Sequence, residues 1–243
     1  MYIPQDVVDL IVDQLSLLTD GCERIRHLQA ASLVSTAWVN RTQRHLFSTL
    51  KFNDSRKIKR WCSRIKPDPY GVSRHVRVLT LGAQYGSTGL DPPLVPSVIK
   101  PALPHFTSFK NLQEFILGYV WFVPTSVDIL APIFSSSASS LKRLRWVHWG
   151  TDIRKTWEEI STLADLLLNL TYVDLSGYRD DISETKIRLS ANGGRSLASK
   201  RFKIHELQLV NVITLSLPFF QSCGPHLQVL DLHVFILSKP SKC

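Results

Sequence analysis

The feature that most constrains the fold is a six-residue pattern that recurs along the chain, with apolar residues at its first, fourth and sixth positions. Successive copies begin 36, 29, 29, 34 and 23 residues apart. The six copies are Val76/Leu79/Leu81, Leu112/Phe115/Leu117, Leu141/Leu144/Trp146, Leu170/Val173/Leu175, Ile204/Leu207/Leu209 and Leu227/Leu230/Leu232. Self-similarity on this scale is typical of repeat architectures, in which each unit buries its apolar face only against its neighbours.

Each copy is predicted to begin a unit made of a short strand and a helix. Side chains alternate across a strand, so the fourth and sixth residues would point inward, while the first closes the preceding turn. The segment TWEEISTLADLLLNL, residues 156–170, carries apolar residues at helical spacing. Segments 94–109 and 127–140 are weaker helix candidates because prolines interrupt them. The expected class is α/β, with a curved, mostly parallel sheet.

The first fifty residues have the pattern of three short helices. Pro4 suits a first turn, and Asp6 and Asp9 complement the positive end of a helix dipole. We expect the first helix to run to residue 18, the second to cover 23–36, and the third to run from 37 or 38 to 47. The first is apolar on two sides, with Val7, Leu10, Ile11 and Leu15 on one face and Val8 and Val12 extending a second. Three short helices enclose little core, so apolar surface is left over for another polypeptide.

The residues of this helical segment follow a known pattern: Ile3, Pro4, Asp6, Val7, Val8, Ile11 and Leu15, and then Leu28, Leu33, Val34, Ser35 and Trp38. With LVSTAW as its most specific part, the segment resembles an F-box, most of all those of fungal proteins. The resemblance implies an F-box over residues 1–50 that docks on a Skp-family adaptor in the helix-in-groove manner. The implied contact residues are Ile3, Pro4, Val7, Val8, Ile11, Leu15, Leu33, Val34 and Trp38.

The six-residue pattern is similar to leucine-rich repeats in a degenerate form. The Asn or Cys expected three residues after the last apolar position is replaced by Gln84, Val120, Trp149, Tyr178, Val212 and Phe235. The resemblance implies an irregular leucine-rich-repeat solenoid over residues 74–243. Together the two resemblances imply a substrate-recognition adaptor of a Skp-cullin-F-box ubiquitin ligase, whose repeats hold the protein to be ubiquitylated. Three residues near the third and fourth predicted strands are candidates for substrate binding: His148, Trp149 and Tyr178.

Positive charge is concentrated between residues 41 and 77, where eleven Lys and Arg stand against Asp54 and Asp68. We interpret residues 51–73 as a basic helical linker. Within it, RKIKRWCSRIK sets Trp61 among cations, a pattern also found in nucleic-acid binding. The same spacing fits an amphipathic helix with a buried Trp61, and an acidic protein partner is a third interpretation. A protein-interaction scaffold whose helical end packs on its own repeats is the main alternative to a ligase adaptor.

The sequence contains no pattern typical of an enzyme: G-x-S-x-G, a Walker loop and H-E-x-x-H are all absent. We therefore expect no catalysis, no cofactor and no metal. The first 23 residues hold five acidic residues and no Lys or Arg, the reverse of a signal peptide. No apolar run approaches the length needed to span a bilayer. These features predict a cytoplasmic or nuclear protein.

Overall fold

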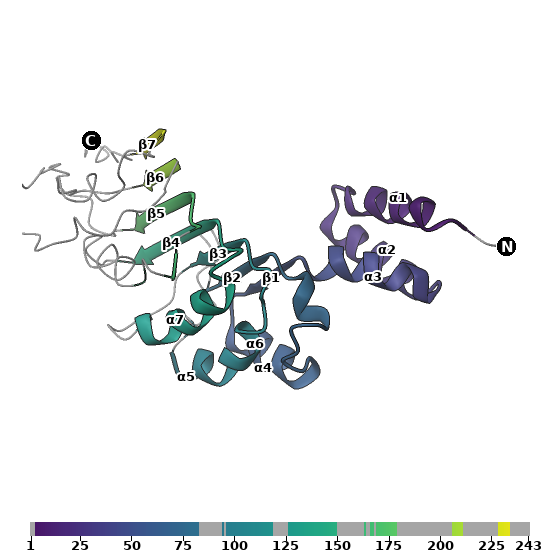
Figure 1. Cartoon of the computed structure of the whole chain (residues 1–243), viewed down its shortest axis with the longest axis horizontal. Coiled ribbons are helices and arrows are strands. Elements are labelled where there is room, and N and C mark those ends of the chain that lie inside the picture. The colour runs from purple at the N-terminus through teal and green to yellow at the C-terminus, as the bar shows by residue number, and fades with distance from the viewer. Residues whose placement is uncertain are drawn as a thin grey trace, which may run out of the picture.

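The computed structural model describes residues 3–82, 94, 96–118, 126–149, 163, 166–167, 169–178, 206–210 and 228–233. The chain is an α/β protein in which three helices precede a parallel sheet (Figure 1). The helices are α1 (Gln5–Ser16), α2 (Gly21–Ser32), α3 (Thr36–Phe47), α4 (Ser55–Arg64), η1 (Val72–His75), α5 (Pro96–Ile99), η2 (Lys100–Ala102), α6 (Leu103–Phe106) and α7 (Ser126–Ser137). The strands are β1 (Thr49–Phe52), β2 (Val78–Leu81), β3 (Glu114–Leu117), β4 (Arg143–Trp149), β5 (Tyr172–Tyr178), β6 (Glu206–Val210) and β7 (Val229–His233).

The seven strands pair in the order of the chain, β1 to β7, and every neighbouring pair is parallel. All six predicted strands are present, and each begins at or next to the third residue of its six-residue pattern. The carbonyl before a strand accepts two successive N–H groups of the next strand, as Ser48 does from Arg77 and Val78. The repeat of the sequence is therefore a repeat of strand register.

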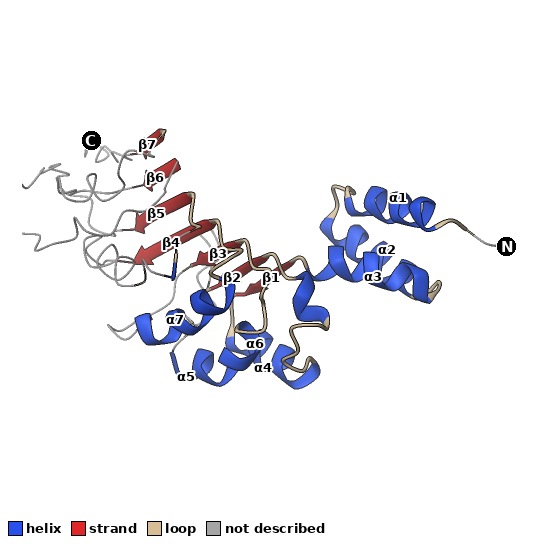
Figure 2. Cartoon of the chain, viewed as in Figure 1, coloured by secondary structure: helices blue, strands red, loops and turns tan. Residues whose placement is uncertain are grey.

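The large core lies between the sheet and α4 to α7, which cover one face of it (Figure 2). The fourth and sixth positions of the pattern are buried, as predicted, in β2 and β3, where the fifth positions Thr80 and Ile116 are buried too. Leu79 and Leu81 are fully buried, and so are Phe115 and Leu117. The first positions of these two units, Val76 and Leu112, and their equivalents in the next two units, Leu141 and Leu170, are also buried in the same core.

The sequence interpretation missed strand β1, which is a seventh copy of the pattern. Phe47, Leu50 and Phe52 occupy the first, fourth and sixth positions, 29 residues before Val76. Leu50 and Phe52 are buried in the large core, and β1 pairs with β2. The range 51–73 is thus not a linker. It contains the end of β1 and helix α4, which pack into the α/β body, although its helical character was correctly predicted.

Prolines divide the segments that connect the strands into short helices. The candidate segment 94–109 divides into α5, η2 and α6, with Pro101 and Pro104 at the starts of η2 and α6, where their missing N–H groups are tolerated. Segment 127–140 forms α7, with Pro132 inside it. Most of segment 156–170 lies outside the described residues, but its Leu163 and Leu167 are buried in the core.

The turns before the strands are held by polar side chains that reach the preceding unit. Asn111 Nδ2 donates to the Arg74 carbonyl at 2.9 Å, and Asn169 Nδ2 donates to the Ala138 carbonyl at 3.0 Å. Ser140 Oγ donates to the Leu112 carbonyl at 2.8 Å. Each of these residues directly precedes the first position of a pattern copy. Turn carbonyls are therefore satisfied before the strands, without the Asn or Cys that usually follows them.

Helices α1 to α3 form a separate unit with a small core of Val8, Val12 and Leu28. Helix α2 begins two residues before its predicted start because the Asp20 carboxylate accepts the N–H groups of Cys22 and Glu23. The two cores meet along α3, where Leu46 packs on the small core and its neighbour Phe47 packs on the large one.

Candidate protein-docking site

Helix α1 has two apolar faces, and the described part of the chain covers one of them. Val8 and Val12, one turn apart, are 1% and 0% exposed in the small core. Val7, Leu10 and Ile11 share a second face and are 41%, 62% and 39% exposed. A helix that served one core alone would carry polar residues on this second face. The exposed face of α1 is therefore the feature of the helical unit that its own packing does not explain.

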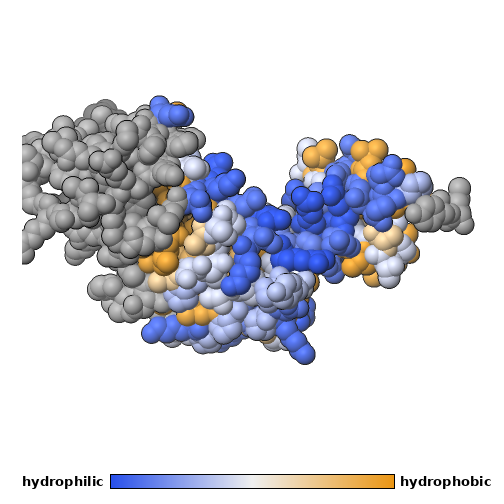
Figure 3. All heavy atoms as spheres, viewed as in Figure 1, coloured by the Kyte–Doolittle hydropathy of each residue, from blue (hydrophilic) through white to orange (hydrophobic). Residues whose placement is uncertain are grey.

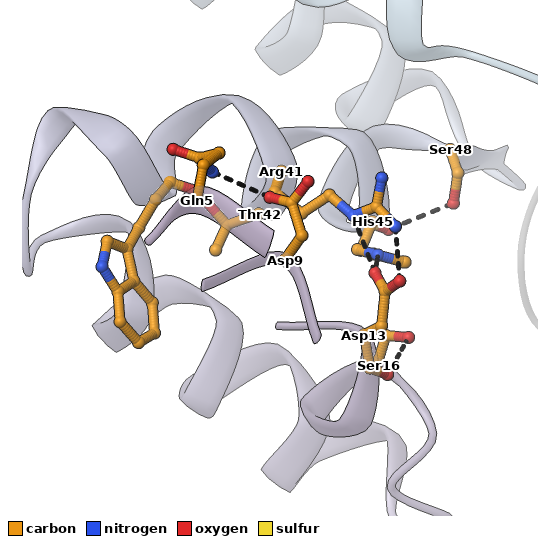
Figure 4. A network of polar contacts seen from close by, with 9 residues as sticks. Gln5, Asp9, Asp13, Ser16, Arg41, Thr42, His45 and Ser48 are labelled. Carbon is orange, nitrogen blue, oxygen red and sulfur yellow. Dashed lines mark hydrogen bonds and ion pairs between the residues drawn. The ribbon is translucent and has the colours of Figure 1, made fainter. Parts of the chain in front are cut away.

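A polar seam joins α1 to α3 beside the small core (Figure 4). Asp13 accepts a hydrogen bond from Arg41 Nε at 2.8 Å, its second oxygen contacts Arg41 Nη2, and His45 Nε2 lies 2.8 Å from Asp13 Oδ1. The hydrogen bonds from Arg41 lower the pKa of Asp13 to about 2, opposed by desolvation and assisted by His45. The same contact raises the pKa of Arg41. Asp13 is thus ionised throughout the physiological range and holds α1 on α3.

The seam also sets the relative direction of the two helices. Gln5 Nε2, at the start of α1, donates to the carbonyl of Ala37 at the start of α3, at 3.3 Å. The first turns of α1 and α3 therefore lie side by side. Ile3 and Val7 consequently share one end of the unit with Leu33 and Val34 in the turn before α3.

These six residues, Ile3, Val7, Leu10, Ile11, Leu33 and Val34, are here called the N-terminal apolar surface. Leu33 is 86% exposed and Val34 is 63% exposed, so each is at least as exposed as Leu10, the most exposed apolar residue of α1 at 62%. In the space-filling view, hydrophobic side chains are exposed on the helical end of the molecule in separate groups with hydrophilic residues between them (Figure 3). The unit therefore exposes several large apolar side chains, and exposed apolar area is a feature of protein interaction sites.

Most of the predicted contact residues are accessible, and one is not. Val8 is buried because the face of α1 that carries it packs on α2 and α3. The prediction that Val8 contacts a partner was therefore wrong, and Val8 is a core residue. Leu15 and Trp38 are half-buried and pack against the same small core. The other six are exposed: Ile3, Pro4, Val7, Ile11, Leu33 and Val34. Leu10, which belongs to the apolar pattern but not to the predicted contact set, is also exposed.

The predicted substrate residues lie at the ends of two neighbouring strands. Trp149 in β4 is the Cα partner of Tyr178 in β5, and His148 is the partner of Gly177. The side chains of these three residues lie outside the described part of the structure. Their role in substrate binding stays a prediction.

The sheet face opposite the helices carries a polar cluster that the sequence interpretation missed. Arg143 lies with its guanidinium carbon 4.4 Å from the centroid of the Tyr172 ring, a cation–π arrangement. Arg145 Nε lies 3.1 Å from Glu114 Oε1. These residues occupy the third and fifth positions of the pattern, which alternate with the buried fourth and sixth. The sequence signal for this cluster is the set of charged and aromatic residues at the third and fifth positions of neighbouring copies.

The chain matches no protein-family model, and a search of curated proteins returns no match. Within the described ranges, none of the helices combines the length and apolar character needed to cross a bilayer.

Proposed function

We propose that this protein is a substrate-recognition adaptor of a Skp-cullin-F-box ubiquitin ligase. In this proposal, helices α1 to α3 act as an F-box that docks on a Skp-family adaptor, and the parallel sheet acts as an irregular leucine-rich-repeat solenoid that holds the substrate. The observation that carries the proposal is the exposed apolar face of α1, which the small core leaves uncovered. The mechanism would be tethering, which raises the effective concentration of substrate lysines near a ubiquitin carrier.

The exposed apolar area is enough for docking but not for very tight binding. Full burial of an aliphatic side chain contributes roughly 1.5 to 3 kcal/mol. The six side chains of the N-terminal apolar surface are already partly covered, so burying the remainder would contribute about 5 to 10 kcal/mol in total. Association costs at least about 4 kcal/mol. A stable complex therefore requires polar contacts around the apolar surface as well.

The sheet supports the second half of the proposal. Its strands follow the chain order without exception from β1 to β7, as expected when each unit stacks only on its neighbours. The face opposite α4 to α7 presents Arg143, Arg145 and Glu114, which are charged groups suited to recognising a protein surface. Substrate binding by this face, together with the ends of β4 and β5, fits this arrangement.

The experiment is a binding assay between the full chain and a purified Skp-family adaptor. Leu10→Asp and Ile11→Asp should each abolish detectable binding while the circular dichroism spectrum stays unchanged, because both side chains face solvent. Tyr70→Asp is the matched control, since Tyr70 is 83% exposed but lies in the loop after α4.

Binding that survives both α1 substitutions would overturn the docking assignment. Such a result would favour the alternative of an interaction scaffold that works without a ligase. Val8→Asp is unsuitable for this test, because placing a carboxylate in the small core would unfold the helical unit.

A further inference from the structure

Helix α4 separates its apolar and charged residues on opposite sides. Ile58 is buried in the large core, and Trp61 and Cys62 pack against it. The indole of Trp61 makes edge contacts with Phe47, Phe52 and Phe109 at centroid distances of 5.9 to 6.3 Å. The remaining side of the helix is exposed and carries five cations: Arg56, Lys57, Lys59, Arg60 and Arg64. We call these five residues the α4 basic face.

The acidic residues in the described part of the chain neutralise little of this positive charge. Among the described residues, the ion pairs of the α4 basic face are those of Asp54 with Arg56 at 4.0 Å and with Lys57 at 3.9 Å. Asp54 also caps the helix by accepting the Lys57 N–H at 2.9 Å. The first turn of α4 contains no acidic residue, although the positive end of the helix dipole favours acids there. A helix selected only for stability would not place Arg56 and Lys57 at this end.

The cations form a regular row. Arg56, Arg60 and Arg64 are separated by four residues each, so they follow one line along the helix at intervals of about 6 Å. Carboxylates four residues apart on an acidic helix have the same spacing. Acidic residues that alternate along an extended strand are about 6.6 Å apart, which is nearly the same. Arginine also binds carboxylates through two parallel hydrogen bonds.

We propose that the α4 basic face binds an acidic segment of a partner protein, one in which carboxylates recur at about 6 Å intervals. Nucleic acid is the weaker interpretation, because proteins that hold single strands stack bases on aromatic rings and the aromatic residue of α4 is turned into the core. The row is also short, covering about 12 Å of helix. This proposal does not depend on the docking of α1 to α3, since α4 packs on the other core.

The test uses the full chain and a fluorescein-labelled peptide with glutamate at every fourth residue. Fluorescence anisotropy at low salt, about 50 mM, gives the affinity. The triple variant Arg56→Gln/Arg60→Gln/Arg64→Gln should weaken binding by about tenfold or more, because it removes the row. The matched control is Lys100→Gln/Lys110→Gln/Lys142→Gln, which removes the same charge from three exposed lysines elsewhere and should change affinity less than about twofold.

Three outcomes would overturn the proposal. The first is no binding of the acidic peptide by the wild-type chain. The second is an equal loss in the two triple variants, which would show that net charge alone attracts the peptide. The third is tighter binding of a DNA duplex or single-stranded RNA that is lost in the arginine variant only, which would assign the α4 basic face to nucleic acid.

Discussion

Two valines on opposite sides of α1 give the sharpest test of how the helical unit is built. Val12 is 0% exposed, whereas Val7 is 41% exposed on the opposite side of the same helix. Val12→Ala removes two methyl groups from a core that contains only Val8, Val12 and Leu28 as fully covered apolar residues. At about 0.8 kcal/mol per carbon, plus about 1 kcal/mol for the cavity, the loss is about 2 to 3 kcal/mol. Val7→Ala should cost less than about 1 kcal/mol.

The loss should be local. A core of this size stabilises a unit by only about 3 to 5 kcal/mol, so Val12→Ala would remove around half of the local stability. The large core should be unaffected, because Val12 does not belong to it. Hydrogen exchange followed by mass spectrometry separates the two regions, because amide protection reports local opening.

In Val12→Ala, amide protection in α1 to α3 should fall by about 50-fold, while protection in β2 and β3 stays unchanged. In Val7→Ala, protection should change little in either region. An equal fall in the two variants would refute the assignment of inner and outer faces. A simultaneous loss in β2 and β3 would refute the separation of the two cores.

Two further predictions concern polar groups. Asp13→Asn should destabilise the helical unit by about 1 kcal/mol at neutral pH, a value discounted because Asp13 is 37% exposed. Folding lowers the pKa of Asp13 from 3.8 to about 2. The stability that Asp13 contributes is therefore complete above about pH 4 and is lost as the pH falls towards 2. In urea titrations at acid pH, the free energies of unfolding of the variant and the wild type should converge. Ser140→Ala should cost about 1 kcal/mol in the same assay, because the Leu112 carbonyl loses its 2.8 Å bond, whereas Ser63→Ala on exposed α4 should be neutral. The role of Ser140 in the turn would be contradicted if the two serine substitutions had equal effects. The role of the Asp13 carboxylate would be contradicted if Asp13→Asn and wild type still differed in stability at pH 2.

Much of the fold could be predicted because its signal is local. The positions of β2 to β7 follow from apolar residues at fixed offsets within six residues, and burial of Leu79, Leu81, Phe115 and Leu117 follows from strand alternation. The same local pattern was present at Phe47, Leu50 and Phe52 but was masked by the surrounding basic residues and by the helix that precedes it. The exposed apolar surplus of α1 was likewise predictable, since too few helices surround it to cover every side.

The sequence by itself determined that the chain is α/β, that its strands recur, and that its first helix is apolar on more than one side. Tertiary structure decided which side of that helix turns inward, because Val8 and Val12 pack with Leu28 of α2. The pairing of Asp13 with Arg41 and His45, 28 and 32 positions away, adds a polar contact between α1 and α3. It also decided that Trp61 lies against Phe47, Phe52 and Phe109, leaving the cations of α4 outside. Local sequence patterns predict which residues prefer burial. Which of those residues are buried depends on contacts with segments that are distant in the sequence.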